Sequence, residues 1–288
     1  MTVMSTLPPV ENHVPAIPIL LYHSISNTAS PSYRSWAVRP ERFAEQLEYL
    51  HKNSYVALTV SQLVRLIRQP NSFPRRPVVI TFDDGLADFY TGALPTLQRY
   101  ELPATLYITT DYVGQTSRWL DNAGEGERPM LSWHQIQELE LSGVECGAHT
   151  RRHPELDTLS LDRARDEIAG SKRALENQLG RPITSFAYPH GYHTAAVKNI
   201  VRQVGFTSAC AVKHALSSPQ DDLFALSRVV VDADTDMALF EGLLEGRGLE
   251  VAPQREKWQT KGWRLYRRSK AQLRQHGLLS FRNTEKVA

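Results

Sequence analysis

The chain has 288 residues, 41% of them hydrophobic, which is enough to bury the core of one large α/β domain or two modest ones. No apolar run approaches the roughly 18 to 20 residues of a membrane span, and the first basic residue is Arg34, so the N-terminus lacks the basic region of a secretory signal. The two cysteines, Cys146 and Cys210, lie in apolar stretches, which favours buried thiols over a disulfide framework or a thiolate metal site. We therefore expect a cytoplasmic protein.

The net charge of +2 conceals an uneven distribution. Residues 255–288 carry ten of the 33 Lys and Arg residues but two of the 31 Asp and Glu residues, so this segment has a net charge of +8 and the rest of the chain −6. An acidic body argues against nucleic-acid binding. Residues 263–279 have an amphipathic helical pattern, for which two alternatives stay open: docking on an anionic membrane surface at its cytoplasmic face, or packing on the folded body.

Short β-branched apolar runs alternate with helical patterns along the chain. Seven runs predict buried strands, at 17–22, 78–82, 104–109, 143–148, 184–188, 207–212 and 226–231. The helical patterns lie at 40–53, 59–69, 87–100, 132–143, 160–180, 194–205 and 234–246. This alternation predicts a parallel sheet with right-handed crossovers, either an open sheet or a barrel, whose chemistry gathers at the carboxyl ends of the strands.

The domain boundaries follow from the same pattern. We expect a flexible arm in residues 1–16, a single catalytic domain in residues 17–250 and a basic amphipathic tail in residues 251–288. The long polar loop 111–130 is expected to form a rim or lid.

Two adjacent carboxylates, Asp83 and Asp84, follow the predicted strand 78–82, and Gly85 permits a tight turn after them. A helix N-cap would explain one aspartate but not both, and the phosphate-binding loop that a Walker B pair requires is absent from the sequence. Like charges this close resist joint ionisation unless a cation offsets them. A metal ligand beside a free base therefore accounts for the pair.

A histidine pair, His149 and His153, follows the predicted strand 143–148 at a spacing that can bring two imidazoles to one metal. This spacing is common by chance in a chain with ten histidines. The metal interpretation gains weight because the pair and the aspartates belong to the same rim of the sheet.

Two further strand ends carry histidines. The stretch "SFAYPHGYH", residues 185–193, places His190 and His193 in a turn whose backbone N–H groups could face an oxyanion, although exposed loop histidines are the alternative. His23 closes the first strand, and in a barrel it would reach the same rim because the first and last strands are neighbours. A structural role is the alternative for His23.

The motifs "TFDDG" (81–85), "HTRRH" (149–153) and "FAYPHG" (186–191) resemble, in order and spacing, those of the NodB-homology polysaccharide deacetylases, carbohydrate esterase family 4. With the opening "PILLYHSI" the chain looks like the exopolysaccharide-type branch. The resemblance covers residues 17–245. It implies a single-domain distorted (β/α)7 barrel that uses a divalent metal, zinc foremost with cobalt, nickel, manganese or iron as alternatives.

The resemblance also implies the roles of individual residues. Asp83 would be the general base, and Asp84, His149 and His153 the metal ligands. The third motif is a turn that includes Pro189. Here the resemblance and the residue types together imply that Tyr188, Pro189 and His190 bind the substrate or stabilise an oxyanion.

Two departures from the family pattern stand out. Ala187 occupies the position where the third motif commonly begins with an arginine that orients the base, and we expect Arg228 to replace that arginine. The late Leu-x-His that supplies the general acid is missing after the seventh strand, and we expect His23 to take that role.

The expected activity is metal-assisted hydrolysis of the N-acetyl group of a hexosamine in a polysaccharide or its lipid-linked precursor, with an N-acetylated glycan as the partner. Two alternatives stay open: a catalytically silent carbohydrate-binding protein, and a hydrolase of a non-sugar amide or ester. Four aromatic residues are candidates for stacking on sugar faces, with burial in the core as the alternative: Trp119, Trp133, Tyr188 and Tyr192.

Overall fold

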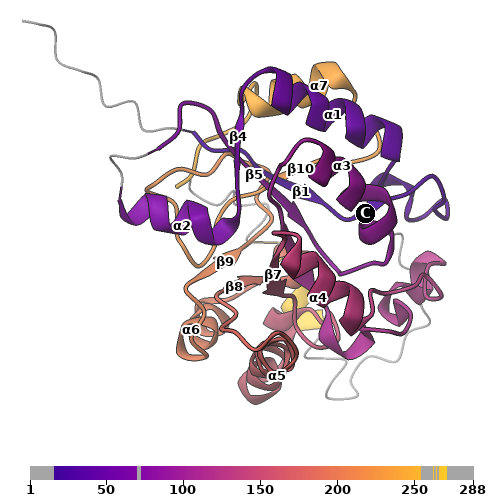
Figure 1. The fold of residues 1–288 in the computed structure, drawn as a ribbon. Helices are drawn as coiled ribbons and strands as arrows, with labels where there is room; N and C mark the ends of the chain where they lie inside the picture. Colours follow the sequence, from indigo (N-terminus) through magenta and orange to yellow (C-terminus); the bar gives the residue numbers. More distant parts are fainter. Residues whose placement is uncertain (1–15, 70–72, 254–261, 263, 265, 271–288) are drawn as a thin grey trace, which may run out of the picture.

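The structure is a computed structural model that describes residues 16–69, 73–253, 262, 264 and 266–270. Its centre is a parallel sheet in which seven strands lie in the order β10-β1-β5-β6-β7-β8-β9, with β4 paired to β5. Figure 1 shows the helices arranged around this sheet. The strands are β1 (Ile19–Tyr22), β4 (Val56–Leu58), β5 (Pro77–Phe82), β6 (Thr105–Ile108), β7 (Glu145–Ala148), β8 (Ser185–Ala187), β9 (Ser208–Cys210) and β10 (Val229–Val230).

The strands are buried on both faces, as their continuous apolar runs predict. Every residue of β1, β5 and β6 is buried, and each of these strands pairs in parallel with its neighbours. Aromatic side chains fill the space between the sheet and the helices, with the rings of Tyr22 and Phe43 and those of Tyr22 and Phe82 both 5.3 Å apart. Burial of one such side chain contributes about 1.5 to 3 kcal/mol.

The helices lie between the strands in the expected order. They are α1 (Pro40–Lys52), α2 (Val60–Arg68), the π-helix η3 (Phe89–Ala93) that continues into α3 (Leu94–Arg99), α4 (Trp133–Leu141), α5 (Leu161–Leu179), α6 (Ala195–Gln203) and α7 (Met237–Leu244). Short polar side chains accept hydrogen bonds from the first turn of five of them, and these N-caps are Thr59, Ser132, Ser160, Thr194 and Asp236.

The prediction of a distorted single-domain α/β barrel is confirmed, with an open seam. The first strand β1 lies between β5 and the last strand β10, as closure requires. Between β9 and β10 the described residues form only an isolated bridge, from Cys210 to Leu226. The seventh strand is accordingly shorter than predicted, because the ladder with β1 covers residues 229–230 of the predicted 226–231.

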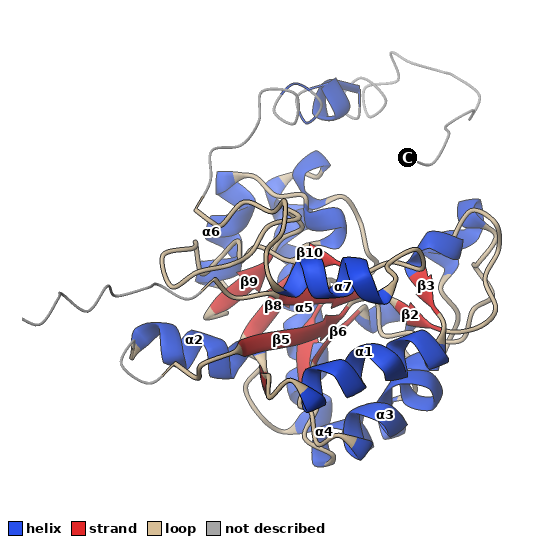
Figure 2. Ribbon diagram, turned by 90° about the horizontal axis from the view of Figure 1, so that it is seen from above, coloured by secondary structure: helices blue, strands red, loops and turns tan. Residues whose placement is uncertain are grey.

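Three elements were not predicted. Strand β4 joins β5, and a two-stranded sheet, β2 (Ser24–Ile25) with β3 (Ala37–Val38), forms within the loop 24–39 beside the main sheet in Figure 2. Each is two or three residues long, too short to produce a hydrophobic pattern. The rim loop 111–130 is ordered by the 3-10 turns η4 (Thr110–Tyr112) and η5 (Arg118–Ala123).

The structure also tests the predictions about the two cysteines and about membrane-spanning helices. Cys146 and Cys210 are free and buried, as expected. Within the described part of the chain no helix is long and apolar enough to span a bilayer. The arm predicted for residues 1–16 lies outside the described residues except for Ala16, and residues 271–288 of the predicted tail lie outside them as well.

Candidate metal and catalytic site

Three potential metal ligands converge at the carboxyl edge of the sheet. Asp84 follows β5, and His149 and His153 follow β7, so two strand ends deliver them to one place. Their ligand atoms all lie within 4.8 Å of one another. Asp84 Oδ1 is 3.7 Å from His149 Nε2 and 3.3 Å from His153 Nε2. One carboxylate and two imidazoles form a donor set that suits zinc and similar divalent metals, with positions left for water and substrate.

Two observations show that this set fits a metal ion. Asp84 Oδ1 is buried and has no hydrogen-bond partner among the described residues, which is costly for a carboxylate unless a cation binds it. Burial, reinforced by the charge of Asp83, raises the pKa of Asp84 well above 3.8. A divalent cation would remove both penalties.

The orientation of His149 is fixed by the neighbouring strand. Its Nδ1 lies 2.8 Å from the carbonyl oxygen of Ala187, at the end of β8. A carbonyl can only accept, so the proton resides on Nδ1, and Nε2 keeps its lone pair facing Asp84. Burial lowers the pKa of His149 to about 4, which keeps the imidazole neutral near pH 7, as a metal ligand must be.

The backbone around the site is strained. Asp84, Thr150, His153 and His190 have φ angles of 76°, 66°, 60° and 56°, in the left-handed region that residues other than glycine rarely adopt. The strain at His153 is offset locally, because its N–H donates to Thr150 Oγ1 at 2.9 Å. Such strain concentrates at functional sites, where the surrounding structure holds residues in a required geometry.

Asp83 lies beside the ligand set and is held by Arg228. The guanidinium donates two parallel hydrogen bonds to the carboxylate, Nη1 to Oδ1 and Nη2 to Oδ2, both 2.7 Å long. Arg228 is fully buried and also donates from Nε to the Ala211 carbonyl at 3.1 Å. Burial alone would raise the pKa of Asp83, but the charge of Arg228 and its hydrogen bonds hold that pKa below 3.8.

The sequence prediction for Arg228 therefore has a structural basis. The arginine precedes β10 and reaches Asp83 through the interior of the barrel, 145 residues away along the chain. Ala187, at the position of the usual arginine, has a buried methyl side chain, and its carbonyl orients His149 instead.

His23 reaches the same rim from the end of β1. Its ring lies 4.7 Å from that of Trp36, and its Nδ1 is buried with no hydrogen-bond partner in the part of the chain that the structure describes. Burial lowers the pKa of His23 to about 4, although the charge of Asp83 opposes this. The imidazole is therefore neutral near pH 7, so a role as general acid requires that it first receive a proton.

The third motif forms a tight turn beside the ligand set. His190 lies in the 3-10 turn η7 (Pro189–Gly191), and its ring is 4.7 Å from that of His153. The neighbouring His193 is not an exposed loop residue, because it stacks on Tyr188 at 4.5 Å and burial lowers its pKa to about 4. His193 is thus packed into the fold, whereas His190 is an exposed loop residue, the alternative that the sequence left open.

The prediction that Tyr188 contacts substrate is wrong. Its side chain is fully buried, and its hydroxyl donates to the Phe224 carbonyl at 2.9 Å. Its N–H donates to the Cys210 carbonyl at 3.1 Å, so it is not a free oxyanion donor. The aromatic ring follows an apolar strand and completes the core, which the strand-end position alone did not reveal.

The other aromatic candidates divide between rim and core. Trp119, in the rim loop, stacks on His153 with ring centroids 5.4 Å apart and thus lies beside the ligand set. Trp133 packs against the main hydrophobic core. Tyr192 lies under the guanidinium of Arg267, 3.6 Å from its ring centroid. Trp36 beside His23 and the Ala187 carbonyl were missed, because neither has a sequence signal before the fold is known.

The described part of the basic tail contacts the body near the site. Arg267 pairs with Glu155 at 2.6 Å and with Asp157 at 2.5 Å, and Arg268 pairs with Asp157 at 3.1 Å. Glu155 and Asp157 follow the His153 loop, and Tyr192 follows the His190 turn. These contacts favour packing on the body, one of the two alternatives for the tail, while membrane contact stays a prediction.

A family model described as "Polysaccharide deacetylase" matches residues 70–209, the segment that contains Asp83, Asp84, His149, His153 and the third motif. Over this segment, just under half of the chain, the sequence is similar to the polysaccharide deacetylase family. Members of the family are metal-dependent hydrolases of carbon–nitrogen bonds that act on N-acetylated glycans, in keeping with the Asp-His-His cluster.

Relatives and solved structures agree with this assignment. YxkH of Bacillus subtilis (strain 168), named as a polysaccharide deacetylase, is 28% identical over 229 residues, covering 80% of this chain and 76% of the relative. The poly-β-1,6-N-acetyl-D-glucosamine N-deacetylase of Staphylococcus epidermidis is 25% identical, covering 76% and 74%. The structure of the Streptococcus pyogenes deacetylase PplD in complex with acetate has a TM-score of 0.70 at 26% identity, covering 80% of this chain and 99% of PplD.

Proposed function

We propose that this protein is a metal-dependent N-deacetylase that removes acetyl groups from N-acetylhexosamine units of a polysaccharide or its lipid-linked precursor, in exopolysaccharide or cell-envelope glycan metabolism. The observation that carries the proposal is the position of Asp83. An ionised carboxylate, fixed by Arg228, lies beside a buried Asp-His-His set that suits a divalent metal. The similarity to a poly-β-1,6-N-acetyl-D-glucosamine N-deacetylase supports the choice of substrate class.

Asp84, His149 and His153 would hold the ion, for which zinc is our first choice because of the mixed carboxylate and imidazole donors. When bound, the ion supplies Lewis acidity at the acetamide carbonyl and lowers the pKa of a neighbouring water. The chain's own residues perform the remaining steps.

Asp83 is the general base. Its Oδ2 lies 3.9 Å from His149 Nε2, so a water between the ligand set and Asp83 is within hydrogen-bonding reach of the carboxylate. Arg228 holds the carboxylate ionised and oriented, ready to take the proton of the attacking water. Because its pKa is low, Asp83 is a weak base. The attacking water must therefore have a lowered pKa before Asp83 can take its proton.

His23 and the His190 turn complete the reaction. His23 is neutral at rest, so it accepts the proton that Asp83 has taken up and delivers it to the departing amine. The backbone N–H of His190 stabilises the oxyanion of the tetrahedral intermediate. We favour His190 because the N–H groups of Tyr188 and Gly191 donate to carbonyls within the fold and Pro189 has none.

The test is release of acetate from β-1,6- and β-1,4-linked N-acetylglucosamine oligomers by protein loaded with zinc. The proposal predicts turnover that a chelator abolishes and added zinc restores. Glycan binding without acetate release would instead support a catalytically silent carbohydrate-binding protein. Acetate release from small non-sugar amides or esters, with none from the oligomers, would support the other alternative.

A further inference from the structure

A cavity opens at the same rim of the sheet as the metal ligands. This cavity of about 600 Å³, which we call the side cavity, is lined by parts of three segments, 26–30, 87–91 and 125–129, together with Gln135. These segments follow β1 through β2, β5 and β6, whose carboxyl ends face the same rim as Asp84. The volume is in the range that small-molecule sites occupy.

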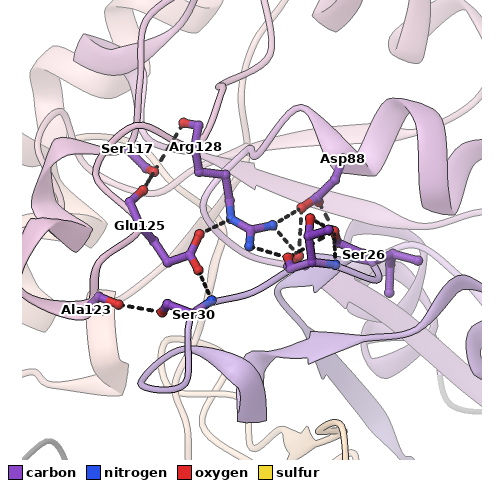
Figure 3. Close-up of polar contacts among 10 residues, drawn as sticks. Ser26, Ser30, Asp88, Ser117, Ala123, Glu125 and Arg128 are labelled. Carbon is purple, nitrogen blue, oxygen red and sulfur yellow. Dashed lines mark hydrogen bonds and ion pairs between the residues drawn. The ribbon is translucent and has the colours of Figure 1, made fainter.

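The wall of the side cavity is built around Arg128, whose side chain is only 9% exposed. In Figure 3 its guanidinium lies between Glu125 and Asp88. Nε donates to Glu125 Oε2 at 2.9 Å, and Nη1 donates to Asp88 Oδ2 at 2.8 Å. Nη1 and Nη2 also donate to Ser24 Oγ at 3.0 Å and to the Thr28 carbonyl at 2.7 Å. With its donors engaged in this way, Arg128 organises the wall and is poorly placed to bind an anion.

The remaining lining has the chemistry of a sugar site. Hydroxyl and amide side chains line the side cavity, from Ser26, Thr28, Ser30, Thr91 and Gln135, and its lining includes neither lysine nor an aromatic ring. Two carboxylates face one guanidinium, which gives the lining a net charge of −1. Carboxylate oxygens have spare lone pairs and therefore accept further hydrogen bonds, most strongly from a cation. The lining favours a hydroxylated ligand with a positive charge.

The side cavity adjoins the catalytic centre. Asp88 follows Asp84 by four residues in the turn after β5. Tyr33 links the two regions, since the Arg128 guanidinium lies 5.2 Å from its ring and it shares an apolar cluster with Trp119. Trp119 in turn stacks on His153. A polymer that places one unit at the metal ligands can therefore extend another toward the side cavity.

We propose that the side cavity binds a glucosamine unit whose amine is already free, on the same glycan chain as the unit being deacetylated. This rests on the proposed function, because it takes the substrate to be a glycan of N-acetylhexosamines. The protonated amine of the product complements the excess carboxylate of Asp88 and Glu125. The protein then prefers partly deacetylated glycan and acts next to units that it has already converted.

The test measures binding to the zinc-free protein, which separates it from turnover. The probes are a glucosamine tetramer with every amine protonated and the fully N-acetylated tetramer, titrated by calorimetry. Thr91→Arg places a long cationic side chain at an exposed position of the cavity lining. Gln98→Arg is the matched control, because it adds the same charge at an exposed position of α3 outside the lining.

The proposal predicts that wild-type protein binds the glucosamine tetramer more tightly than the acetylated one. Thr91→Arg should weaken binding of the glucosamine tetramer about tenfold, equivalent to about 1.4 kcal/mol, while Gln98→Arg retains wild-type affinity. Equal affinity of Thr91→Arg and wild type, tighter binding of the acetylated tetramer, or binding of neither would overturn it. Failure of the deacetylase assignment would show separately, as absence of acetate release from zinc-loaded protein.

Discussion

Arg228 and Asp83 form a two-pronged ion pair inside the barrel, with both N···O contacts 2.7 Å long. Neither residue is accessible to solvent to any useful extent, since Arg228 is fully buried and Asp83 is 3% exposed. Arg228 also spans the seam between β9 and β10, because its Nε donates to the carbonyl of Ala211 just after β9. A structural and a catalytic task thus meet in one side chain.

Arg228→Lys tests the positioning role of this arginine. Lysine keeps the charge but cannot make two parallel hydrogen bonds, so Asp83 should lose its fixed orientation. We expect kcat to fall about 10- to 100-fold with little change in KM or zinc content. Acetate-release kinetics and metal analysis measure these quantities, and a wild-type kcat would remove the positioning role. Arg228→Met serves as a stability control, because it leaves a buried charge unpaired and should destabilise the fold by about 3 kcal/mol.

Asp83→Asn and His149→Ala separate the base from the metal ligands. Asparagine preserves the shape of Asp83 but cannot take a proton, so turnover should fall by about 10² to 10⁴ while zinc remains bound. His149→Ala removes a ligand and should lose zinc and turnover together. Elemental analysis beside acetate release distinguishes the two patterns. An Asp83→Asn protein with normal turnover would end the assignment of Asp83 as the base.

His193 provides a test of buried neutral histidines away from the metal ligands. Its pKa is about 4 in the fold, against 6.5 for an unperturbed histidine, because of burial. Between those values the unfolded chain binds more protons than the native one, so the free energy of unfolding rises with pH. The contribution of neutral His193 to the free energy of unfolding is fully present above pH 6.5 and is lost as the pH falls through 4.

His193→Gln should therefore flatten this dependence by about 1 kcal/mol per pH unit within that window. Urea unfolding of metal-free protein at several pH values measures the slope. His134→Gln is the control, since the His134 side chain is 80% exposed. An unchanged slope in His193→Gln would contradict the packing of His193 against Tyr188.

The tail contacts are testable through stability. The Asp157 side chain has no exposed surface and pairs with both Arg267 and Arg268. Replacement of both arginines by alanine removes these cationic partners and should destabilise the protein by about 3 kcal/mol. Adding Asp157→Asn should recover much of that loss, because a neutral amide is less costly to bury. Ser269→Ala, at an exposed position of the same helix, is the control. A double-alanine variant as stable as wild type would show that these contacts do not hold the tail in solution.

The parallel sheet and the meeting of the motifs at its rim could be predicted because strand ends carry both signals. Buried strands read as continuous apolar runs, and chemistry at the carboxyl ends follows from parallel pairing. The same reasoning misplaced Tyr188, since a residue one position past a strand can face either the core or the rim. The sequence pattern does not indicate whether such a residue faces the core or the rim.

Other features depend on contacts between distant segments. The hydrogen bond from His149 to the Ala187 carbonyl joins the loop after β7 to the end of β8 through a backbone atom, so no side-chain motif records it. The side cavity arises where three loops meet around Arg128, and each loop looks like an ordinary polar connection. Arg228 could be named in advance only through the family resemblance, which implies an arginine beside the base where this chain has Ala187.

The central claim is that one divalent cation binds Asp84, His149 and His153 beside Asp83. The most direct measurement is anomalous diffraction at the zinc absorption edge from crystals of zinc-loaded protein. We predict a single strong peak about 2.0 to 2.2 Å from Asp84 Oδ1, His149 Nε2 and His153 Nε2, with Asp83 outside the coordination shell. A peak bound to other residues, or the lack of any peak in active protein, would contradict the account.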